Sequence, residues 1–262
     1  MRSIKSLDYL GNIAIISFYD SVSKKNKLKF AKSILRKQKQ IKTVLEKKGK
    51  IKGRLRKIST IHLLGERTKE VLYRENNCVF RFNIDSTYFS PRLSNERKEI
   101  SESIKKNDVV LVMFAGVGPF SIVLAKHSLA KKVFSNEINR EANKYMKLNI
   151  ELNKLKERVE ILPGDIKRIA KKLSKLVKFN VIIMPRPQLR ESFLKEAFIL
   201  SKKDTKIYYY DFCKIEDTGK IKEKIVSEAK KCRKKIKIIS IKHAGEIAPY
   251  KIRVRVDFKV IN

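Results

Sequence analysis

Three short segments of this chain carry residue types that can hold an adenosine-containing ligand. A glycine-containing stretch follows the apolar run 109–113, Glu137 and Ile138 follow a second apolar run, and Asp165 follows a third. Glycine lets a backbone approach a ligand closely, the amides of a following helix face that ligand, and an acid at a strand tip can accept from a ribose diol. The pattern predicts a cofactor site formed by Glu137, Ile138, Asp165 and the stretch Phe114, Ala115, Gly116, Val117, Gly118, Pro119 and Phe120.

The glycine stretch alone leaves a purely structural turn open, because Ser121 stands where a dinucleotide fingerprint has its third glycine. Two features favour S-adenosylmethionine over NAD. Asp165 could accept from an adenine amine, and the chain ends in two β-rich runs, 235–241 and 251–260, around a short turn. A terminal antiparallel hairpin on an otherwise parallel sheet is the layout of class I methyltransferases.

The elements that would position these residues alternate from Asp108 onward. Apolar runs predict strands near 109–114, 132–136, 159–162, 180–184, 206–211, 236–243 and 251–260. Helical periodicity predicts helices near 119–127, 140–153, 166–176, 189–200 and 218–231. This order predicts an α/β, Rossmann-like fold in which helices flank a parallel sheet that a terminal hairpin extends.

The first part of the chain does not share this alternation. Its patterns predict strands near 12–18, 41–45, 58–63, 70–73 and 79–84 and one helix near 24–39. A further helix near 94–105 would join this part to the rest. We therefore expect a small α+β domain over 1–93 and the methyltransferase-like domain over 94–262.

The charge of the chain predicts an anionic partner. Its 63 Lys and Arg residues against 27 Asp and Glu residues give a formal net charge of +36, with a sequence pI near 10.1. Genome bias or heat adaptation explains part of the lysine content, but thermophilic ion pairs need both signs. The basic run 47–57 reads either as a solvated loop or as an RNA-contacting loop, with Lys50, Lys52 and Arg54 as the substrate contacts.

Several classes of protein are disfavoured. No apolar run approaches the roughly 20 residues that span a bilayer, and no apolar signal region follows the first five residues. The cysteines (Cys78, Cys213 and Cys232) and the histidines (His62, His127 and His243) show no ligand spacing, so neither a metal site nor a disulfide framework is indicated. We expect a soluble, cytoplasmic, monomeric protein without a metal.

Segments spread over nearly the whole chain resemble the archaeal and eukaryotic tRNA (guanine-37, nitrogen-1) methyltransferases. Their presence in the right order is more specific than any one of them. The matching segments are 11–15, 42–45, 62–66, 88–93 with Glu96 and Arg97, 114–120, 148–153 and 248–258. The resemblance implies a class I methyltransferase domain preceded by a tRNA-binding domain, and an enzyme that uses S-adenosylmethionine to methylate the purine on the 3′ side of the anticodon.

The resemblance also implies roles for single residues. Nitrogen 1 of guanine carries a proton at neutral pH, so Glu96 would be the general base, with a first-turn acid favoured by the helix dipole as the alternative. Arg56 would stabilise the charge that develops on the guanine oxygen, and Arg92 is the second candidate, although both could simply bind phosphate. Tyr88, next to Phe89, would stack on a flipped base unless the pair packs in the core.

Three departures from the family pattern bear on function. Family members commonly carry a further small N-terminal domain, and the resemblance starts after it. Val112 stands where an acid usually ends the first strand. Pro185-Arg186-Pro187 replaces the common Asn-Leu-Pro, with Pro185 expected at the cofactor and Pro187 among the catalytic residues.

The Pro-Arg-Pro segment resembles an archaeal branch that also methylates carbon 7 of 4-demethylwyosine in wyosine synthesis. Two alternatives stay open. One is the sister class that transfers the aminocarboxypropyl group of the same cofactor, against which Ser90-Pro91-Arg92 and Glu96 argue. The other is a non-catalytic RNA-binding protein.

Overall fold

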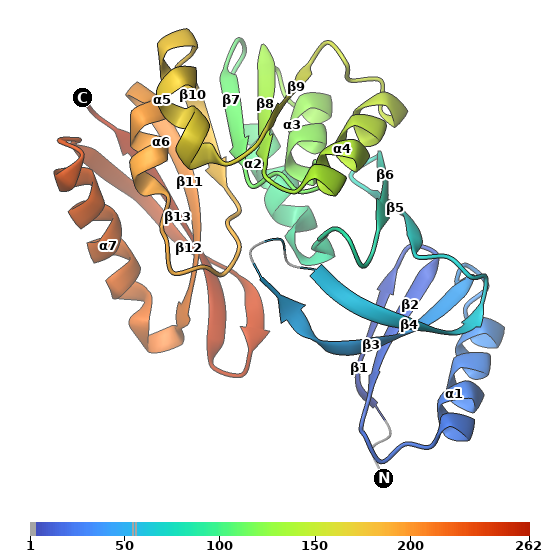
Figure 1. The fold of residues 1–262 in the computed structure, drawn as a ribbon. Coiled ribbons are helices and arrows are strands. Elements are labelled where there is room, and N and C mark those ends of the chain that lie inside the picture. The colour runs from blue at the N-terminus through green and yellow to red at the C-terminus, as the bar shows by residue number, and fades with distance from the viewer. Residues whose placement is uncertain (1–3, 54, 56) are drawn as a thin grey trace. The chain divides into compact units, whose positions relative to one another are not determined.

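The computed structural model describes residues 4–53, 55 and 57–262 (Figure 1). The chain divides into two compact units, Met1–Pro91 and Arg92–Asn262. The sequence expectation placed this boundary between residues 93 and 94. Each unit is described by itself below.

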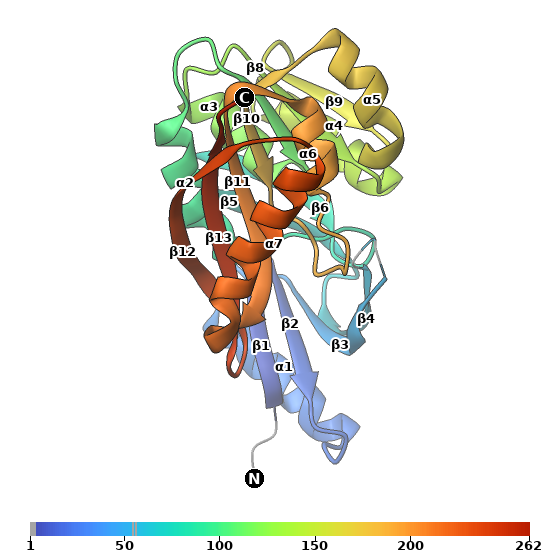
Figure 2. The ribbon, with the colours of Figure 1, turned by 90° about the vertical axis from the view of Figure 1, so that its left-hand side faces the viewer.

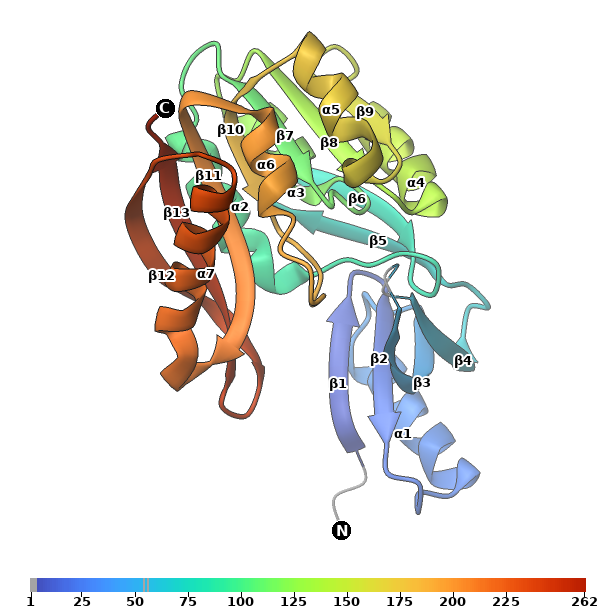
Figure 3. The same cartoon turned by 60° about the vertical axis from the view of Figure 1, so that its left-hand side comes forward.

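The first unit is a four-stranded sheet with one helix and a separate hairpin (Figure 3). The sheet has the order β1-β2-β3-β4, in which β2 and β3 are parallel and the other neighbours are antiparallel. The hairpin is formed by β5 and β6. The elements are β1 Ile4–Leu10, β2 Ile13–Phe18, α1 Lys24–Lys37, β3 Thr43–Lys52, β4 Lys57–Gly65, β5 Glu70–Glu75 and β6 Cys78–Asn83.

Helix α1 crosses over between the parallel strands β2 and β3, and its apolar side packs on the sheet. Ser23 caps it by accepting from the backbone N–H of Asn26, and Ala31 and Ile34 are buried. They join Ala14, Ile16, Phe18, Ile41 and Val44 in one core cluster. The helix was predicted correctly because its apolar residues recur at helical spacing.

The aromatic residues of the hairpin enclose Phe89. Its ring stacks on Phe82 at 4.8 Å between centroids and also contacts Phe80 and Tyr73. Phe89 is therefore a core residue and is not available to stack on a base. Of the two possibilities that the sequence left open for it, core packing is correct. Tyr88, its neighbour, is half-buried.

The interpretation of 47–57 as a loop is wrong. Strands β3 and β4 form an antiparallel hairpin whose register closes at Lys52 and Lys57. Gly49 and Gly53 take positive φ angles of 69° and 65°, which lets the backbone bulge and turn inside a lysine-rich hairpin. Strand β1 was also missed, because it is an edge strand whose side chains show no clean alternation of buried and exposed positions.

The second unit has the expected class I methyltransferase fold (Figure 2). Its seven-stranded sheet has the order β12-β13-β11-β10-β7-β8-β9, and only β13 runs antiparallel to its two neighbours. The strands are β7 Val109–Met113, β8 Lys132–Glu137, β9 Val159–Pro163, β10 Phe179–Met184, β11 Ser201–Lys214, β12 Ile236–Ala248 and β13 Lys251–Val260.

Helices cover both faces of this sheet (Figures 1 and 2). On one face, α5, α6 and α7 bury their apolar residues against Leu111, Met113, Ile182 and other core residues. On the other face lie α2, α3 and α4. The helices are α2 Ser94–Ser103, α3 Pro119–His127, α4 Arg140–Leu152, α5 Ile166–Leu176, α6 Leu194–Leu200 and α7 Thr218–Lys231, with short 3₁₀ turns at Pro91–Leu93 and Ile215–Asp217.

Helix α6 is shorter than the predicted 189–200. It begins only at Leu194, after Phe193 in a left-handed conformation, and residues 185–193 are irregular. The guanidinium of Arg186 binds the carbonyls of Leu189 and Glu191, which fixes these residues in a non-helical path. Among the described residues, no helix combines the length and apolar character needed to cross a membrane.

Gly118 has little room for a side chain, because its backbone is left-handed and it packs against Met146. It caps α3 with φ 89°, and a Cβ there would lie 2.9 Å from Cγ of Met146. We expect Gly118→Ala to lower the free energy of unfolding by about 1–3 kcal/mol in urea titrations, because a left-handed conformation and overpacking both cost stability.

The matched control is Gly219→Ala at the start of α7, where a Cβ would meet no atom within 4 Å. Alanine there should be neutral or stabilising by up to about 1 kcal/mol. Equal stability of the two variants would contradict the constraint at Gly118.

Candidate functional site

The order of the parallel strands reverses beside β7, which is where a fold of this type is expected to bind a ligand. From β7 the chain continues to β8 and β9 on one side, whereas β10 pairs with β7 on the other. At such a reversal the loops at the carboxyl ends of the strands diverge and leave room for a ligand. The three predicted cofactor segments lie at the carboxyl ends of β7, β8 and β9, with Glu137 as the last residue of β8, so the fold brings them to one edge of the sheet.

The loop after β7 is a tight turn into α3. Phe114, Gly116 and Gly118 have φ angles of 59°, 58° and 89°, and Pro119 opens the helix. The N–H of Gly118 donates to the carbonyl of Ala115 at 3.0 Å. The side chains of Ala115, Val117, Pro119 and Phe120 are buried, whereas Phe114 and Gly116 are partly exposed. The ring of Phe114 packs edge-on against Phe193.

The carboxylate of Glu137 is held by backbone amides. One oxygen accepts from the N–H of Gly116 at 2.8 Å and the other from the N–H of Asn139 at 2.7 Å. Burial raises the pKa of Glu137, and the backbone N–H groups of Asn139, Gly116 and Ile138 oppose that rise. Three backbone N–H groups occupy three of the roughly four lone-pair sites of the carboxylate, so one site remains to accept a hydrogen bond from a ribose hydroxyl.

The tip of β9 is tied to the same point. The N–H of Gly164 donates to the carbonyl of Glu137 at 2.9 Å, and Asp165 caps α5 by accepting from the N–H of Lys167. The side-chain amide of Asn136 donates to the carbonyls of Leu162 and Gly164 at 2.8 and 3.0 Å. Asn136 was missed, although an amide directly before a strand-tip acid was visible in the sequence.

The loop after β10 is fixed by a buried ion pair that the sequence did not reveal. Arg186 is 3% exposed, and its guanidinium lies 2.7 Å from Oδ1 of Asp211 on β11. Asp211 also accepts from Tyr209 and Lys224, each at 2.9 Å. Arg186 therefore points into the protein and anchors the loop. In the sequence, the only feature that pointed to this ion pair was an arginine between two prolines after an apolar strand.

Glu96 lies in the first turn of α2, yet its carboxylate is engaged by the sheet. Oε2 accepts from the hydroxyl of Tyr210 on β11 at 2.6 Å and from Nη1 of Arg255 on β13 at 2.8 Å. The side chain is 14% exposed. The sequence had not pointed to Tyr210 or Arg255 as partners of Glu96. Arg255 could have been noticed as a charged residue between two valines of an otherwise apolar strand.

The structure places the remaining expected residues as follows. Arg92 is exposed and donates to the carbonyl of Glu246 at 3.3 Å. Pro185 and Pro187 are partly exposed in the loop after β10. Arg54 and Arg56 lie outside the described residues, as do the side chains of Lys50 and Lys52.

Val112 is fully buried in β7, in register with Ser135 and Ile183. The hydroxyl of Ser135 has no hydrogen-bond partner within the described part of the chain. An apolar side chain thus fills the position at which the resemblance led us to expect an acid.

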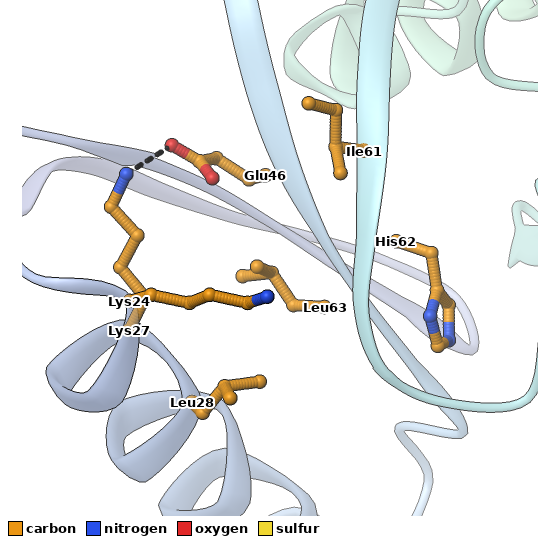
Figure 4. A pocket seen from close by; sticks show the side chains of 7 residues that line it. All are labelled: Lys24, Lys27, Leu28, Glu46, Ile61, His62 and Leu63. Carbon is orange, nitrogen blue, oxygen red and sulfur yellow. Dashed lines mark hydrogen bonds and ion pairs between the residues drawn. The ribbon is translucent and has the colours of Figure 1, made fainter.

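A separate hollow of about 320 Å³ lies in the first unit between α1 and strands β3 and β4 (Figure 4). Burial by itself would raise the pKa of Glu46, but hydrogen bonds from Lys27 at 2.8 Å and Lys48 at 2.9 Å lower it. Lys24 extends over the apolar floor. The lining residues are Lys24, Lys27, Leu28, Glu46, Ile61, His62 and Leu63.

Comparison with known proteins agrees with this geometry. The TRM5/TYW2 methyltransferase domain family matches residues 71–245. The tRNA (guanine(37)-N(1))-methyltransferase Trm5b of Pyrococcus abyssi is 36% identical over 97% of this chain and 74% of its own length. The tRNA (guanine(37)-N(1))/4-demethylwyosine(37)-methyltransferase Taw22 of Nanoarchaeum equitans is 32% identical over 98% of this chain and its whole length.

Two solved structures resemble the fold closely. A complex of aTrm5 with tRNALeu has a TM-score of 0.84 at 31% identity and covers 99% of this chain and 73% of that one. Methanocaldococcus jannaschii Trm5 with adenosine has a TM-score of 0.81 at 30% identity and covers 99% and 75%. With a family match over most of its length and a relative aligned from end to end, the chain belongs to the TRM5/TYW2 methyltransferase family.

Proposed function

We propose that this chain transfers a methyl group from S-adenosylmethionine to nitrogen 1 of guanine-37 in tRNA. The observation that carries the proposal is the carboxylate of Glu96, which is partly exposed and has one oxygen without a hydrogen-bond partner among the described residues. The same unit contains the crevice built from the loops after β7, β8 and β9. The relatives that align with nearly the whole chain bear the same activity in their names.

The residues of the crevice would hold the cofactor in separate ways. Glu137 would accept from the ribose hydroxyls, and Ile138 and Asp165 would lie at the adenine. The turn 114–120 would pass beneath the ligand, with Pro185 at its other side. When bound, S-adenosylmethionine supplies an electrophilic methyl group. The fit rests on the lone pair of the Glu137 carboxylate that the three backbone N–H groups leave open.

Glu96 would remove the proton from nitrogen 1 of the guanine. This proton must leave because only the deprotonated nitrogen has an electron pair to form the new bond. Arg56, or Arg92, would balance the negative charge that then develops on the guanine oxygen. Tyr88 would stack on the base, and Pro187 would line its pocket.

The first unit would bind the tRNA backbone. Every charged residue of α1 is a lysine or an arginine, and Lys24 extends over the hollow beside it. Leu28 and Ile61 at the hollow are 36% and 49% exposed. These apolar side chains would lose contact with water if an unstacked base or a ribose packed on them. The lysines of the hairpin β3–β4, together with the sequence candidates Lys50, Lys52 and Arg54, would add phosphate contacts.

The proposal extends to the second reaction named in one relative. Taw22 of Nanoarchaeum equitans, which aligns over its whole length, also acts on 4-demethylwyosine. Incubating the protein with unmodified tRNA and with tRNA that carries the wyosine precursor, followed by mass mapping of position 37, tests both substrates. An aminocarboxypropyl product would instead identify the sister reaction. Size-exclusion chromatography tests the further expectation of a monomer, which we place in the cytoplasm.

Glu96→Gln should slow single-turnover methylation of guanine-37 by about 10²–10⁴, or roughly 3–5 kcal/mol in the barrier. Affinities for tRNA and cofactor should change little, because the residue removes a proton and holds no phosphate. Glu102→Gln is the matched control, since Glu102 is an exposed acid on the same helix. A near-normal rate for Glu96→Gln at neutral pH would remove this residue from the mechanism.

Glu137→Ala should weaken binding of S-adenosylmethionine by about 10–100-fold in calorimetry, because a hydrogen bond to a charged group contributes about 1.5–3 kcal/mol. Glu160→Ala on β9 is the control, since that side chain is 49% exposed and lies earlier on its strand. Thermal unfolding of both variants checks that the fold survives. Unchanged affinity for the Glu137 variant would contradict the ribose assignment.

Lys24→Ala should weaken tRNA binding and reduce the slope of log affinity against log salt by about one. Ile61→Ser should weaken binding without changing that slope, because it removes apolar contact and no charge. Lys32→Ala, exposed on α1 but outside the hollow, is the control and should lose less than either. Equal effects of Lys24→Ala and Lys32→Ala would rule out the hollow as a distinct contact.

A further inference from the structure

The carboxylate of Glu96 is held by one of its two oxygens. Oε2 accepts from both Tyr210, at 2.6 Å, and Arg255, at 2.8 Å. Oε1 has no hydrogen-bond partner within the described residues, and the side chain is 14% exposed to solvent. One oxygen is therefore fixed in direction while the other is free to meet a substrate.

Arg255 alone would make Glu96 a poor base. A guanidinium at 2.8 Å stabilises the ionised carboxylate and so reduces its affinity for a proton. Arg255 is 1% exposed, and its pKa is raised above its usual range by the surrounding acids even though burial opposes that rise. Its charge is thus permanent, and something must offset it if Glu96 is to take a proton.

Two further carboxylates share the charge of Arg255. Asp257 accepts from Nε at 2.8 Å and from Nη2 at 3.1 Å, and Glu99 accepts from Nη2 at 2.7 Å. Glu99 also pairs with Lys242. Hydrogen bonds from Arg255 and Lys242 lower the pKa of Glu99 to about 2, so it is ionised.

The charges of this cluster do not cancel. Glu96, Glu99 and Asp257 supply three negative charges against the two positive charges of Arg255 and Lys242, which leaves one negative charge in excess. Arg255 and Asp257 are buried, whereas Glu99 and Lys242 at the edge of the cluster are each 45% exposed.

Within the described part of the chain, no hydrogen bond to the Glu96 carboxylate other than those of Tyr210 and Arg255 is found. Burial and the charge of Glu96 raise the pKa of Tyr210 well above its usual value, so its hydroxyl stays protonated and donates. Arg97, the next residue of α2, lies over the ring of Phe120 at 5.5 Å. Tyr208 shares a hydrogen bond with Ser103.

We propose that Tyr210 and Arg255 are positioning residues that present Oε1 of Glu96 to the guanine, and that Glu99 and Asp257 keep this carboxylate basic. The inference rests on the proposed function. In the step, the N1–H bond of guanine breaks, its electron pair stays on nitrogen 1, and the proton forms an O–H bond at Oε1. Glu99 acts through Arg255 and touches no substrate.

The test is the pH dependence of single-turnover methylation between about pH 5 and pH 9, at saturating tRNA and cofactor. Wild type should show an acid limb in which the rate rises as Glu96 loses its proton. Tyr210→Phe removes a hydrogen bond from the ionised carboxylate, so the limb should move to higher pH by about one unit.

Glu99→Gln should move the limb in the opposite direction. Loss of this negative charge leaves Arg255 less compensated, so Glu96 holds its proton less tightly. The limb should move to lower pH by about half a unit, and the plateau rate should fall several-fold because the base is weaker. Glu102→Gln, on the same helix but outside the cluster, should retain the wild-type profile.

The outcomes separate this inference from the proposed function. If Glu96→Gln is slow but neither variant shifts the limb, or both shift it in the same direction, the cluster only holds the fold together and the inference is wrong. If Glu96→Gln is as fast as wild type, the base assignment itself fails. Should Tyr210→Phe not fold, Glu99→Gln decides alone, since the Glu99 side chain is 45% exposed and glutamine keeps its size.

Discussion

Glu137 joins the ends of three neighbouring strands. Its carboxylate binds the N–H of Gly116 in the loop after β7, and its carbonyl binds the N–H of Gly164 after β9. A buried carboxylate is costly unless it is hydrogen-bonded, and here the backbone amides supply those bonds. These bonds hold the three strand ends together at the place where we propose that the ribose binds.

A second polar region lies under α2, where apolar packing would have been simpler. Replacing a buried ion pair by apolar groups is often neutral or stabilising, so burial of Arg255 with three acids needs another reason. Asp211 and Arg186 form a comparable pair under the loop after β10. Both regions contact segments to which we assign roles in the proposed reaction, namely Glu96 and the Pro-Arg-Pro loop, and such contacts would hold those segments in one position.

The two units differ in the size of their apolar core and in their surface charge. The α/β unit has a continuous apolar core and a crevice whose polar groups are hydrogen-bonded. The first unit is small and has a basic helix and a lysine-rich hairpin beside a modest core. Its charges suit contacts to phosphates, which give affinity without needing the accuracy that proton transfer demands.

Local patterns in the sequence determined the order of the elements and, through it, the cofactor edge. Alternation of strands and helices places every parallel strand end at one edge, so 114–120, Glu137 and Asp165 could be assigned together. Local patterns predicted the wrong secondary structure in two places. The glycines of the β3–β4 hairpin are typical of a loop, so the hairpin was not predicted. The helical periodicity of 189–193 was misleading because Arg186 binds the backbone there and keeps these residues out of α6.

Only the tertiary structure decided what Glu96 contacts. Tyr210 and Arg255 lie 114 and 159 residues away from it in the chain. They face each other because β11 and β13 pair in that register, with Lys242 opposite Arg255 on the next strand. A slip of one residue would turn these side chains to the other face of the sheet. Strand register depends on packing of the whole sheet, and no local pattern in the sequence carries that information.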